Sequence, residues 1–335
     1  MNEKRKKFSR RQFVSSSAVS LAGIMIIPSA ACNRSGGAKK DPNLVRLGFI
    51  GLGRQAMYLT DGFIRIPGVE VRAGCDVYGI KRTRFANKVN AFYTESGKTI
   101  RAETYEKYGD LLDRDDIDAV VISVPDHAHA FMAIAALKAG KDVYLEKPMT
   151  FTIYEGQQLK KTVRETGRIL GVGSQQRSDA SFRHAVTLVQ TGAIGAVSRV
   201  NAFVGPPPKP YDLAEEPVPA DLNWDLWLGP LPGTIHYNRE LNPPISLDPP
   251  IDEEYWAGWR WYRETGGGFT TDWGAHMFDI AQWGLGMDGS GPVEISPVGD
   301  GSEFISWKYA NGVIMTSEPF NETRTRGVKF WGERG

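Results

Sequence analysis

The sequence has few cysteines, no long apolar run and no excess of charge. Only two of the 335 residues are cysteines, which excludes a fold held together by disulfides. The 40 basic and 39 acidic residues nearly cancel, so the basic stripe that nucleic-acid binding needs is absent. With 41% apolar and 24% charged residues the composition is globular, and the length indicates about two domains.

The positive charge of the chain is concentrated at its N-terminus. Six Lys or Arg and one acid lie in residues 1–31, and an apolar core too short to span a bilayer follows the basic cluster. This pattern predicts a signal peptide, and Ser9–Val14 (SRRQFV) resembles the twin-arginine (Tat) signal of proteins exported in the folded state. A basic tail in front of a buried helix is the alternative.

The end of this segment also resembles a lipobox. Ser29-Ala30-Ala31-Cys32 would place a lipid on Cys32, although Ser29 stands where that motif prefers Leu. Residues 32–43 are rich in Gly, Lys and Ser and are typical of a flexible linker. We therefore expect a periplasmic protein, with a lipid anchor at Cys32 as one option.

A short apolar run, a glycine pair and an amphipathic stretch follow one another from Leu44 to about Pro67. In Gly51-Leu52-Gly53-Arg54-Gln55-Ala56 the glycines allow a tight turn and a close backbone approach to a pyrophosphate. The pyrophosphate would lie at the N-terminus of the helix, beside Arg54 and Gln55. The pattern predicts a dinucleotide site.

A second expected strand, residues 69–75, ends at Asp76. A carboxylate at this spacing can take both ribose hydroxyls and repel a 2′-phosphate, which favours NAD over NADP. A plain turn residue is the alternative for Asp76. NADP stays open because three cations follow in the chain: Lys81, Arg82 and Arg84.

Strand-like and helix-like stretches then alternate along the chain. We expect strands at 117–124, 142–145 and 169–172, and helices at 131–139 and 153–166. The last helix has the spacing of a capping box, formed by Thr152 and Glu155. Such alternation predicts a doubly wound, mostly parallel sheet over residues 44–175, whose ligands bind beyond the carboxyl ends of the strands.

Polar residues follow two of these strands. His127 and His129 could form a metal pair, but two ligands without a nearby third make a poor site, and we predict no metal. Lys147 follows the next strand in Glu146-Lys147-Pro148. A lysine beside a cofactor cleft is suited to donating or accepting a proton, although it could equally be a surface lysine.

Taken together and in order, these segments resemble the Gfo/Idh/MocA oxidoreductase family. The resemblance rests on Gly51-Leu52-Gly53, Asp76, Pro125-Asp126-x-x-His129, Glu146-Lys147-Pro148, and Gly266–His276 followed by Asp279. It implies an α/β fold with an N-terminal Rossmann domain and a C-terminal α+β domain, residues 176–335. That second domain would carry an open, largely antiparallel sheet through which the protein forms homo-oligomers.

The resemblance also implies a set of roles. It makes Lys147 the substrate-orienting catalytic lysine, Asp272 its acidic partner and His276 the general acid/base, and the Lys147–Pro148 bond is often cis in relatives. Asp272 and His276, four residues apart, would share one face of a helix. Alternatively, Asp272 caps that helix and His276 is a core histidine. The expected cofactor contacts are Gly51, Gly53, Arg54, Gln55, Asp76, Pro125, Asp126, His129 and Glu146.

The substrate candidates lie later in the chain. Relatives place an arginine-bearing segment after the strand near Val172, which makes Gln176 and Arg177 candidates, and Tyr237 and Arg260 are further ones. All nine tryptophans follow residue 223, and flat aromatic faces suit sugar rings, although we expect most of them to pack in the core.

The C-terminal part shows two further strand patterns. Ile305–Met315 reads as a hairpin around Asn311-Gly312, and Gly327–Gly332 begins another strand just before the sequence stops. Relatives continue well past this point, so we expect the second domain to be incomplete in this chain.

Three functions follow as hypotheses. The first is an exported oxidoreductase with tightly bound NAD, or NADP, that transfers hydride at a ring carbon of a sugar, glycoside or cyclitol. The second is a glycosidase or lyase that uses captive NAD to oxidise C3 transiently, so that a glycosidic bond eliminates. The third is a non-catalytic sugar-binding protein.

Overall fold

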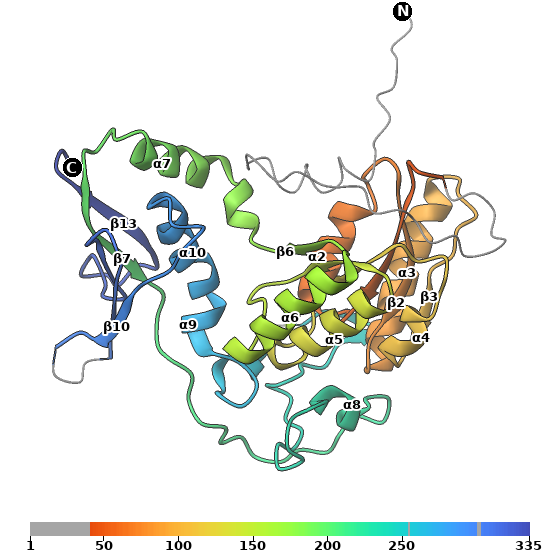
Figure 1. Cartoon of the computed structure of the whole chain (residues 1–335). Helices are drawn as coiled ribbons and strands as arrows, with labels where there is room; N and C mark the ends of the chain where they lie inside the picture. Colours follow the sequence, from red (N-terminus) through yellow and green to blue (C-terminus); the bar gives the residue numbers. More distant parts are fainter. Residues whose placement is uncertain (1–40, 254, 300–302) are drawn as a thin grey trace, which may run out of the picture.

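The computed structural model of the chain describes residues 41–253, 255–299 and 303–335. The expected signal peptide, with the Tat-like motif and Cys32, lies outside the described residues, as does most of the expected linker. The described chain forms two lobes (Figure 1), each with its own sheet. No helix in the described ranges combines the length and the apolar character needed to cross a membrane.

The first lobe contains a six-stranded parallel sheet with the order β3-β2-β1-β4-β5-β6. Its strands are β1 (Val45–Ile50), β2 (Val69–Cys75), β3 (Glu103–Tyr105), β4 (Ala119–Ile122), β5 (Asp142–Leu145) and β6 (Leu170–Val172). Its helices are α2 (Arg54–Phe63), α3 (Gly79–Glu95), α4 (Tyr108–Leu112), α5 (Asp126–Lys138) and α6 (Ile153–Thr166). The order reverses between β1 and β4, which is the Rossmann arrangement and confirms the predicted fold class.

Burial explains why these residues form this sheet. Every residue of β4 is buried, and β1 is buried at all but one position, as expected of strands covered by helices on both faces. The capping box predicted at the start of α6 is present: Thr152 accepts from the Glu155 amide, and Glu155 accepts from the Thr152 amide. Helix α5 begins at Asp126, five residues earlier than the expected start at Phe131, because Pro125 provides an extended N-cap.

The second lobe contains a five-stranded sheet with the order β10-β11-β12-β7-β13. Its strands are β7 (Val197–Phe203), β10 (Glu294–Pro297), β11 (Ile305–Lys308), β12 (Ile314–Thr316) and β13 (Gly327–Gly332), with helices α7 (Ala180–Gln190) and α10 (Gly274–Gly284) packed beside it. All neighbouring strands are antiparallel except β12 and β7, which are parallel. The hairpin predicted around Asn311-Gly312 is confirmed by the β11–β12 pair.

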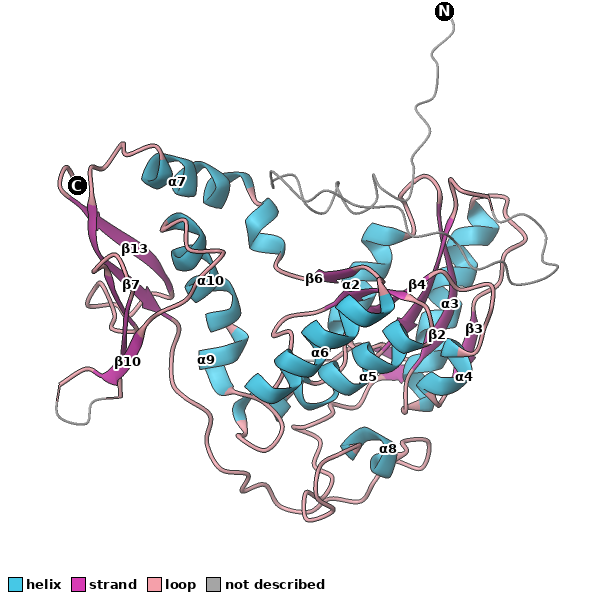
Figure 2. Cartoon of the chain, viewed as in Figure 1, coloured by secondary structure: helices cyan, strands magenta, loops and turns pink. Residues whose placement is uncertain are grey.

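The segment between β7 and α10 returns from the second lobe to the first (Figure 2). It carries α8 (Trp224–Leu228), β8 (Ser246–Leu247), β9 (Pro250–Ile251), a 3-10 turn at Gly258–Trp261 and α9 (Gly268–Asp272); a second 3-10 turn, Gln175–Ser178, follows β6. Contact with the first lobe is made through the backbone, since the Asn223 amide donates to the Val77 carbonyl at 3.0 Å. The carboxyl edge of the parallel sheet is therefore covered by residues distant in sequence.

Candidate active site

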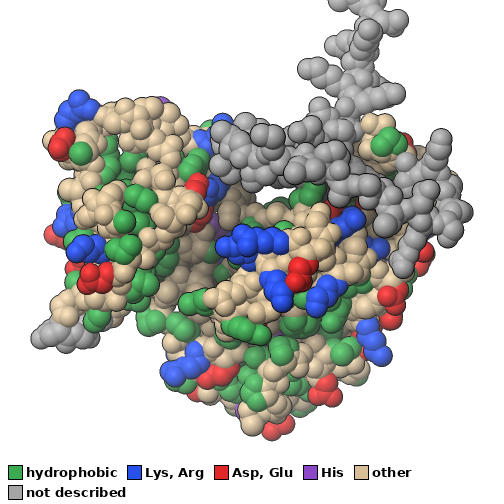
Figure 3. Space-filling model, in the orientation of Figure 1, with side chains coloured by type: hydrophobic (Ala, Val, Ile, Leu, Met, Phe, Trp, Pro, Cys, Tyr) green, Lys and Arg blue, Asp and Glu red, His purple; other side chains and the backbone are tan. Residues whose placement is uncertain are grey.

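A cavity of about 970 Å³ lies where the two lobes meet, and Figure 3 shows the hollow between them. Its walls come from the carboxyl ends of β1, β2, β4 and β5, and from the segment that precedes α10. Most of the predicted site residues line it: Gly51, Gly53, Arg54, Gln55, Asp76, Pro125, Asp126, His129, Glu146, Lys147, Gln176, Arg260, Asp272 and His276.

Two of the expected substrate residues do not line the cavity. Arg177 forms ion pairs with Asp279 and Asp288, each at 2.7 Å, so it ties the turn after β6 to the C-terminal half of the second lobe. Tyr237 is 4% exposed, and its ring packs edge-on against Trp224. Both side chains therefore hold the fold together, and we withdraw them as substrate contacts.

The glycine-rich turn after β1 provides the space that a pyrophosphate needs. Gly51 has φ of 82°, and a side chain there would meet the Ser123 carbonyl at 2.7 Å. Beside Gly53, in contrast, an added Cβ would have no protein atom within 4 Å, so this residue faces open space. No side chain caps the N-terminus of α2, which leaves its first amides available to an anion. The turn thus fits a dinucleotide.

Asp76 is held at the end of β2 by two backbone amides. Its Oδ2 accepts from the Leu52 amide at 2.7 Å and its Oδ1 from the Tyr78 amide at 2.9 Å. Each carboxylate oxygen can accept a second hydrogen bond, so both can still bind ribose hydroxyls.

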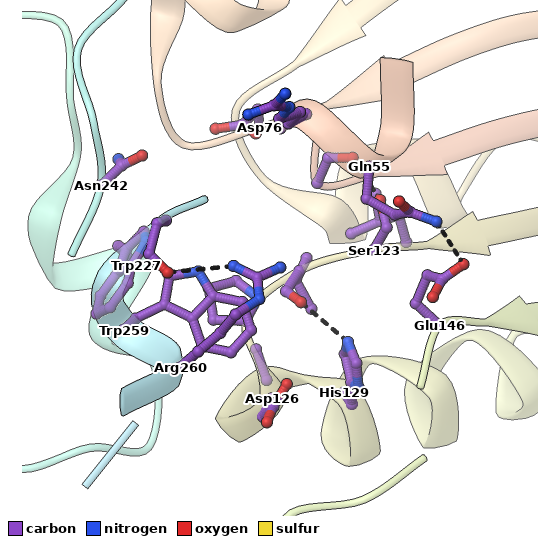
Figure 4. Close-up of a pocket in the computed structure, with 18 of the residues that line it drawn as sticks. Gln55, Asp76, Ser123, Asp126, His129, Glu146, Trp227, Asn242, Trp259 and Arg260 are labelled. Carbon is purple, nitrogen blue, oxygen red and sulfur yellow. Dashed lines mark hydrogen bonds between the residues drawn. The ribbon is translucent and has the colours of Figure 1, made fainter. Parts of the chain in front are cut away.

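Glu146 links β5 to the glycine-rich turn. Gln55 Nε2 donates to Glu146 Oε1 at 3.0 Å, and Figure 4 shows these two side chains pointing at each other. The Lys147 amide donates to the other carboxylate oxygen at 3.2 Å. Burial raises the pKa of Glu146. The position of Lys147 is thus coupled to the element that would hold the pyrophosphate.

His129 is a buried positioning residue. Its Nδ1 lies 2.6 Å from the Pro148 carbonyl and its Nε2 lies 2.9 Å from the Val124 carbonyl, so its ring nitrogens contact backbone on both sides. Burial lowers the pKa of His129 to about 4. His129 thus links the chain just before α5 to the residue after Lys147, and this contact helps to fix the position of Lys147. The Lys147–Pro148 bond is cis.

Lys147, Asp272 and His276 meet on one wall of the cavity. Lys147 Nζ donates to Asp272 Oδ1 at 2.7 Å and to the Asp272 carbonyl at 3.0 Å. Burial, followed by the positive charge of Lys147, lowers the pKa of His276 to about 4, so its imidazole is neutral at neutral pH. Within the described chain, His276 Nδ1 is buried without a hydrogen-bond partner, and such an atom is costly unless a ligand satisfies it.

The helix expected to carry Asp272 and His276 is in fact two helices. Asp272 ends α9 and His276 belongs to α10, with Trp273 between them in a helical conformation. Nor does Asp272 act as a cap. Gly268, with φ of 62°, lets α9 start against the backbone of Pro208, which an added Cβ would meet at 2.5 Å. A residue without a side chain is thus required here by the close packing of α9 against Pro208.

Arg260 and several aromatic side chains form the part of the cavity next to Asp272. The Arg260 guanidinium lies 4.1 Å from the centroid of the Trp259 ring, and its Nε lies 3.6 Å from Asp272 Oδ1. Asp126 is 3% exposed, and burial raises its pKa to about 7. Five of the nine tryptophans line the cavity: Trp227, Trp256, Trp259, Trp261 and Trp273.

Other cavity residues carry no sequence signal. Asn242, Glu253 and Arg326 line the walls, yet they lie in stretches without a motif or a clear period. Only the topology brings them to the site. Among the described residues no group of three or more His, Cys, Asp or Glu is placed to hold a metal ion.

Residues 45–174 match the model of the Gfo/Idh/MocA oxidoreductase family, described as an NAD-binding Rossmann fold. The first lobe is thus similar to the NAD-binding domain of that family. A glycosyl hydrolase family 109 protein of Shewanella pealeana is 32% identical over 176 residues, which cover 48% of this chain and 38% of that protein. The chain thus spans less than half the length of this curated relative.

Solved structures show that the likeness in fold extends over the second lobe. A 3-ketoreductase variant from Actinomadura kijaniata, crystallised with TDP-benzene and NADP, superposes with a TM-score of 0.58 at 21% identity, covering 87% of this chain and 74% of that one. For myo-inositol 2-dehydrogenase from Lactobacillus plantarum the TM-score is 0.56 at 21% identity, over 87% and 75% of the two chains. At this identity the likeness establishes the fold.

Proposed function

We propose that the chain is an NAD-dependent oxidoreductase that transfers hydride at a ring carbon bearing a hydroxyl, in a sugar, glycoside or cyclitol. One observation carries this proposal: Lys147, Asp272 and His276 converge in the same cavity as the glycine-rich turn and Asp76. A proton-transfer group and a dinucleotide site that share one cavity are what oxidation of an alcohol requires.

Each group in the site has a separate role in this proposal. Bound NAD supplies the hydride acceptor, at nicotinamide C4. Lys147, held by Asp272, donates a hydrogen bond from Nζ to the substrate oxygen and fixes its orientation. His276 takes the hydroxyl proton, since its imidazole is neutral and buried next to Lys147. The aromatic walls offer flat faces to a ring and exclude water.

A second candidate is a glycosidase or lyase that works through the same residues. The name of the Shewanella pealeana relative, glycosyl hydrolase family 109, favours it. Transient oxidation at C3 of a glycoside would acidify the proton on the neighbouring carbon, and removal of that proton would expel the leaving group. Return of the hydride would then leave no net oxidation, which suits an enzyme whose cofactor is not exchanged.

We further propose that the protein is exported to the periplasm by the Tat route, optionally lipid-anchored at Cys32, and that it forms homo-oligomers. The basic and apolar pattern of residues 1–31 supports export. Exposed apolar side chains on the second-lobe sheet, with Ile295 63% exposed and Ile314 41% exposed, support association through that sheet.

The test begins with protein purified from its native export route. Any nucleotide released on denaturation is identified, and glycosides and cyclitols are then added while the absorbance of reduced nicotinamide is followed at about 340 nm. Stoichiometric reduction that requires added NAD supports the dehydrogenase. Catalytic turnover of aryl glycosides without added NAD and without net reduction supports the second candidate. Absence of both bound nucleotide and NAD affinity would exclude both.

A further inference from the structure

The cations that follow Asp76 bear on the choice between NAD and NADP. In Rossmann domains a basic side chain near the end of the second strand accommodates the 2′-phosphate of NADP. Lys81, Arg82 and Arg84 lie at this position, and Lys81 lines the cavity together with Asp76. Arg82 is already engaged, because it donates to the Asp76 carbonyl at 2.6 Å.

The other two cations are held by one carboxylate. Glu253 Oε1 lies 3.2 Å from Lys81 Nζ, and the two guanidinium nitrogens of Arg84 contact the Glu253 oxygens at 2.6 Å and 3.2 Å. Asn242 Oδ1 accepts a further hydrogen bond from Lys81 at 2.8 Å, and Figure 4 shows Asn242 and Asp76 on the cavity wall. Glu253 and Asn242 both come from the segment that returns from the second lobe.

This cluster is buried and charged. The side chains of Lys81, Arg84 and Glu253 are 8%, 11% and 5% exposed. Burial alone would raise the pKa of Glu253, but the charges of Lys81 and Arg84 hold it below its ordinary value. Glu253 is therefore an anion in the region that a 2′-phosphate, itself an anion, would have to enter.

The backbone donors at the start of α3 are occupied as well. Asp221 Oδ2 accepts from the Ile80 amide at 2.8 Å, and the Asp221 carbonyl accepts from the Gly79 amide at 2.9 Å. Like Glu253, Asp221 belongs to the returning segment. A phosphate at this end of the site would find both its cations and its amides already bound.

We propose that Glu253 determines specificity for NAD over NADP, because it withholds Lys81 and Arg84 from a 2′-phosphate and places a negative charge beside Asp76. The proposal rests on the proposed function, since it presupposes a dinucleotide whose ribose lies against Asp76. It assigns cofactor choice to a residue of the returning segment, about 180 residues away in sequence from the turn that usually determines Rossmann cofactor specificity.

The test is the ratio of the two dinucleotides bound at equilibrium. Wild type, Glu253→Gln, Glu253→Asp and Asp252→Asn are each incubated with equal concentrations of NAD and NADP until exchange is complete, and the bound nucleotides are then quantified by mass spectrometry. Glu253→Gln removes the negative charge and weakens the contacts that hold Lys81 and Arg84. Because these cations can then bind a 2′-phosphate, the NADP-to-NAD ratio of Glu253→Gln should rise about tenfold or more. Glu253→Asp keeps the charge and should stay near wild type.

Asp252→Asn is the matched control. Asp252 also pairs with Arg84, but it is 78% exposed and does not line the cavity. The NADP-to-NAD ratio of Asp252→Asn should equal that of wild type. In the double variant Lys81→Met/Glu253→Gln the gain in NADP should be smaller than in Glu253→Gln, since one of the two freed cations has been removed.

The outcomes separate the two proposals. If wild type binds neither dinucleotide, the proposed function fails. If wild type binds NAD but the Glu253→Gln ratio stays within about twofold of wild type in a variant that still binds NAD, the role of Glu253 is refuted. Should Glu253→Gln fail to fold, Glu253→Ala/Lys81→Met is compared with Lys81→Met alone. A higher NADP-to-NAD ratio in the double variant supports the role of Glu253, because the negative charge is gone and Arg84 is released, whereas an equal ratio contradicts it.

Discussion

Replacing Asp272 by Asn removes one negative charge from the centre of the proposed active site and keeps the size and shape of the side chain. The carboxylate is the shared partner of two cations, Lys147 at 2.7 Å and Arg260 at 3.6 Å. Asp272 and Lys147 are 14% and 16% exposed, so water can replace little of the lost interaction. The substitution therefore leaves two like charges close together and removes the carboxylate that contacts both.

The expected magnitude follows from that burial. Removing one partner of a buried ion pair costs about 3–5 kcal/mol, and because the amide still accepts a hydrogen bond we expect the lower end, about 3 kcal/mol. The effect on catalysis comes in addition to the effect on stability, because Lys147 loses its fixed orientation. We expect kcat to fall by about a hundredfold or more. Dinucleotide affinity should change little, because Asp76 and the glycine-rich turn are untouched.

The assay compares Asp272→Asn with Asp288→Asn in urea unfolding and in turnover. Asp288 also pairs with an arginine at 2.7 Å, but it is 37% exposed and lies outside the cavity. A pair of that kind contributes less than about 1 kcal/mol. Equal destabilisation by the two substitutions would refute the reasoning about burial. Wild-type kcat in Asp272→Asn would remove Asp272 from the mechanism.

Further predictions concern the cofactor turn and the histidine. Gly53→Ala should fold normally, because an added Cβ meets no protein atom, yet bind NAD about tenfold more weakly or worse; Gly62→Ala, on the exposed side of α2, is the control in the same titration. His276→Asn should lower kcat by about a hundredfold or more while Lys147 and NAD binding remain, as kinetics and calorimetry would show. The depressed pKa of His276 and His129 means that the unfolded chain takes up protons that the folded chain does not, so the free energy of unfolding should fall as pH decreases from 6.5 toward about 4. His276→Asn should make this dependence shallower, and an unchanged pH profile of unfolding would contradict the assignment.

The first lobe was predictable because its signals are local. The apolar run of β1, the glycines that follow it and the capping box of Thr152 and Glu155 each depend on residues within a few positions of one another. The same is true of the hairpin at Asn311-Gly312. Lys147 and Asp76 were found for a related reason: each directly follows a strand, and parallel strands end at the same edge.

The remaining features depend on contacts that local patterns do not encode. A spacing of four between Asp272 and His276 is compatible with one helix, and only the structure shows the break at Trp273. An arginine after β6 can face a ligand or a carboxylate, and Arg177 faces Asp279 because α10 is packed against that turn. Glu253 lies in a proline-rich stretch without periodicity, so its place beside Lys81 follows only from the path of the returning segment.

The central claim is that Lys147 positions a substrate hydroxyl for oxidation beside a bound dinucleotide. It is tested most directly by mixing NAD-loaded wild type and NAD-loaded Lys147→Met with the same substrate and following the absorbance at about 340 nm in a single turnover. Lys138→Met, a change at the exposed end of α5, serves as the control. We expect equal NAD content in all three proteins and a rate about a hundredfold or more lower in Lys147→Met alone. Equal rates in wild type and Lys147→Met would contradict the account.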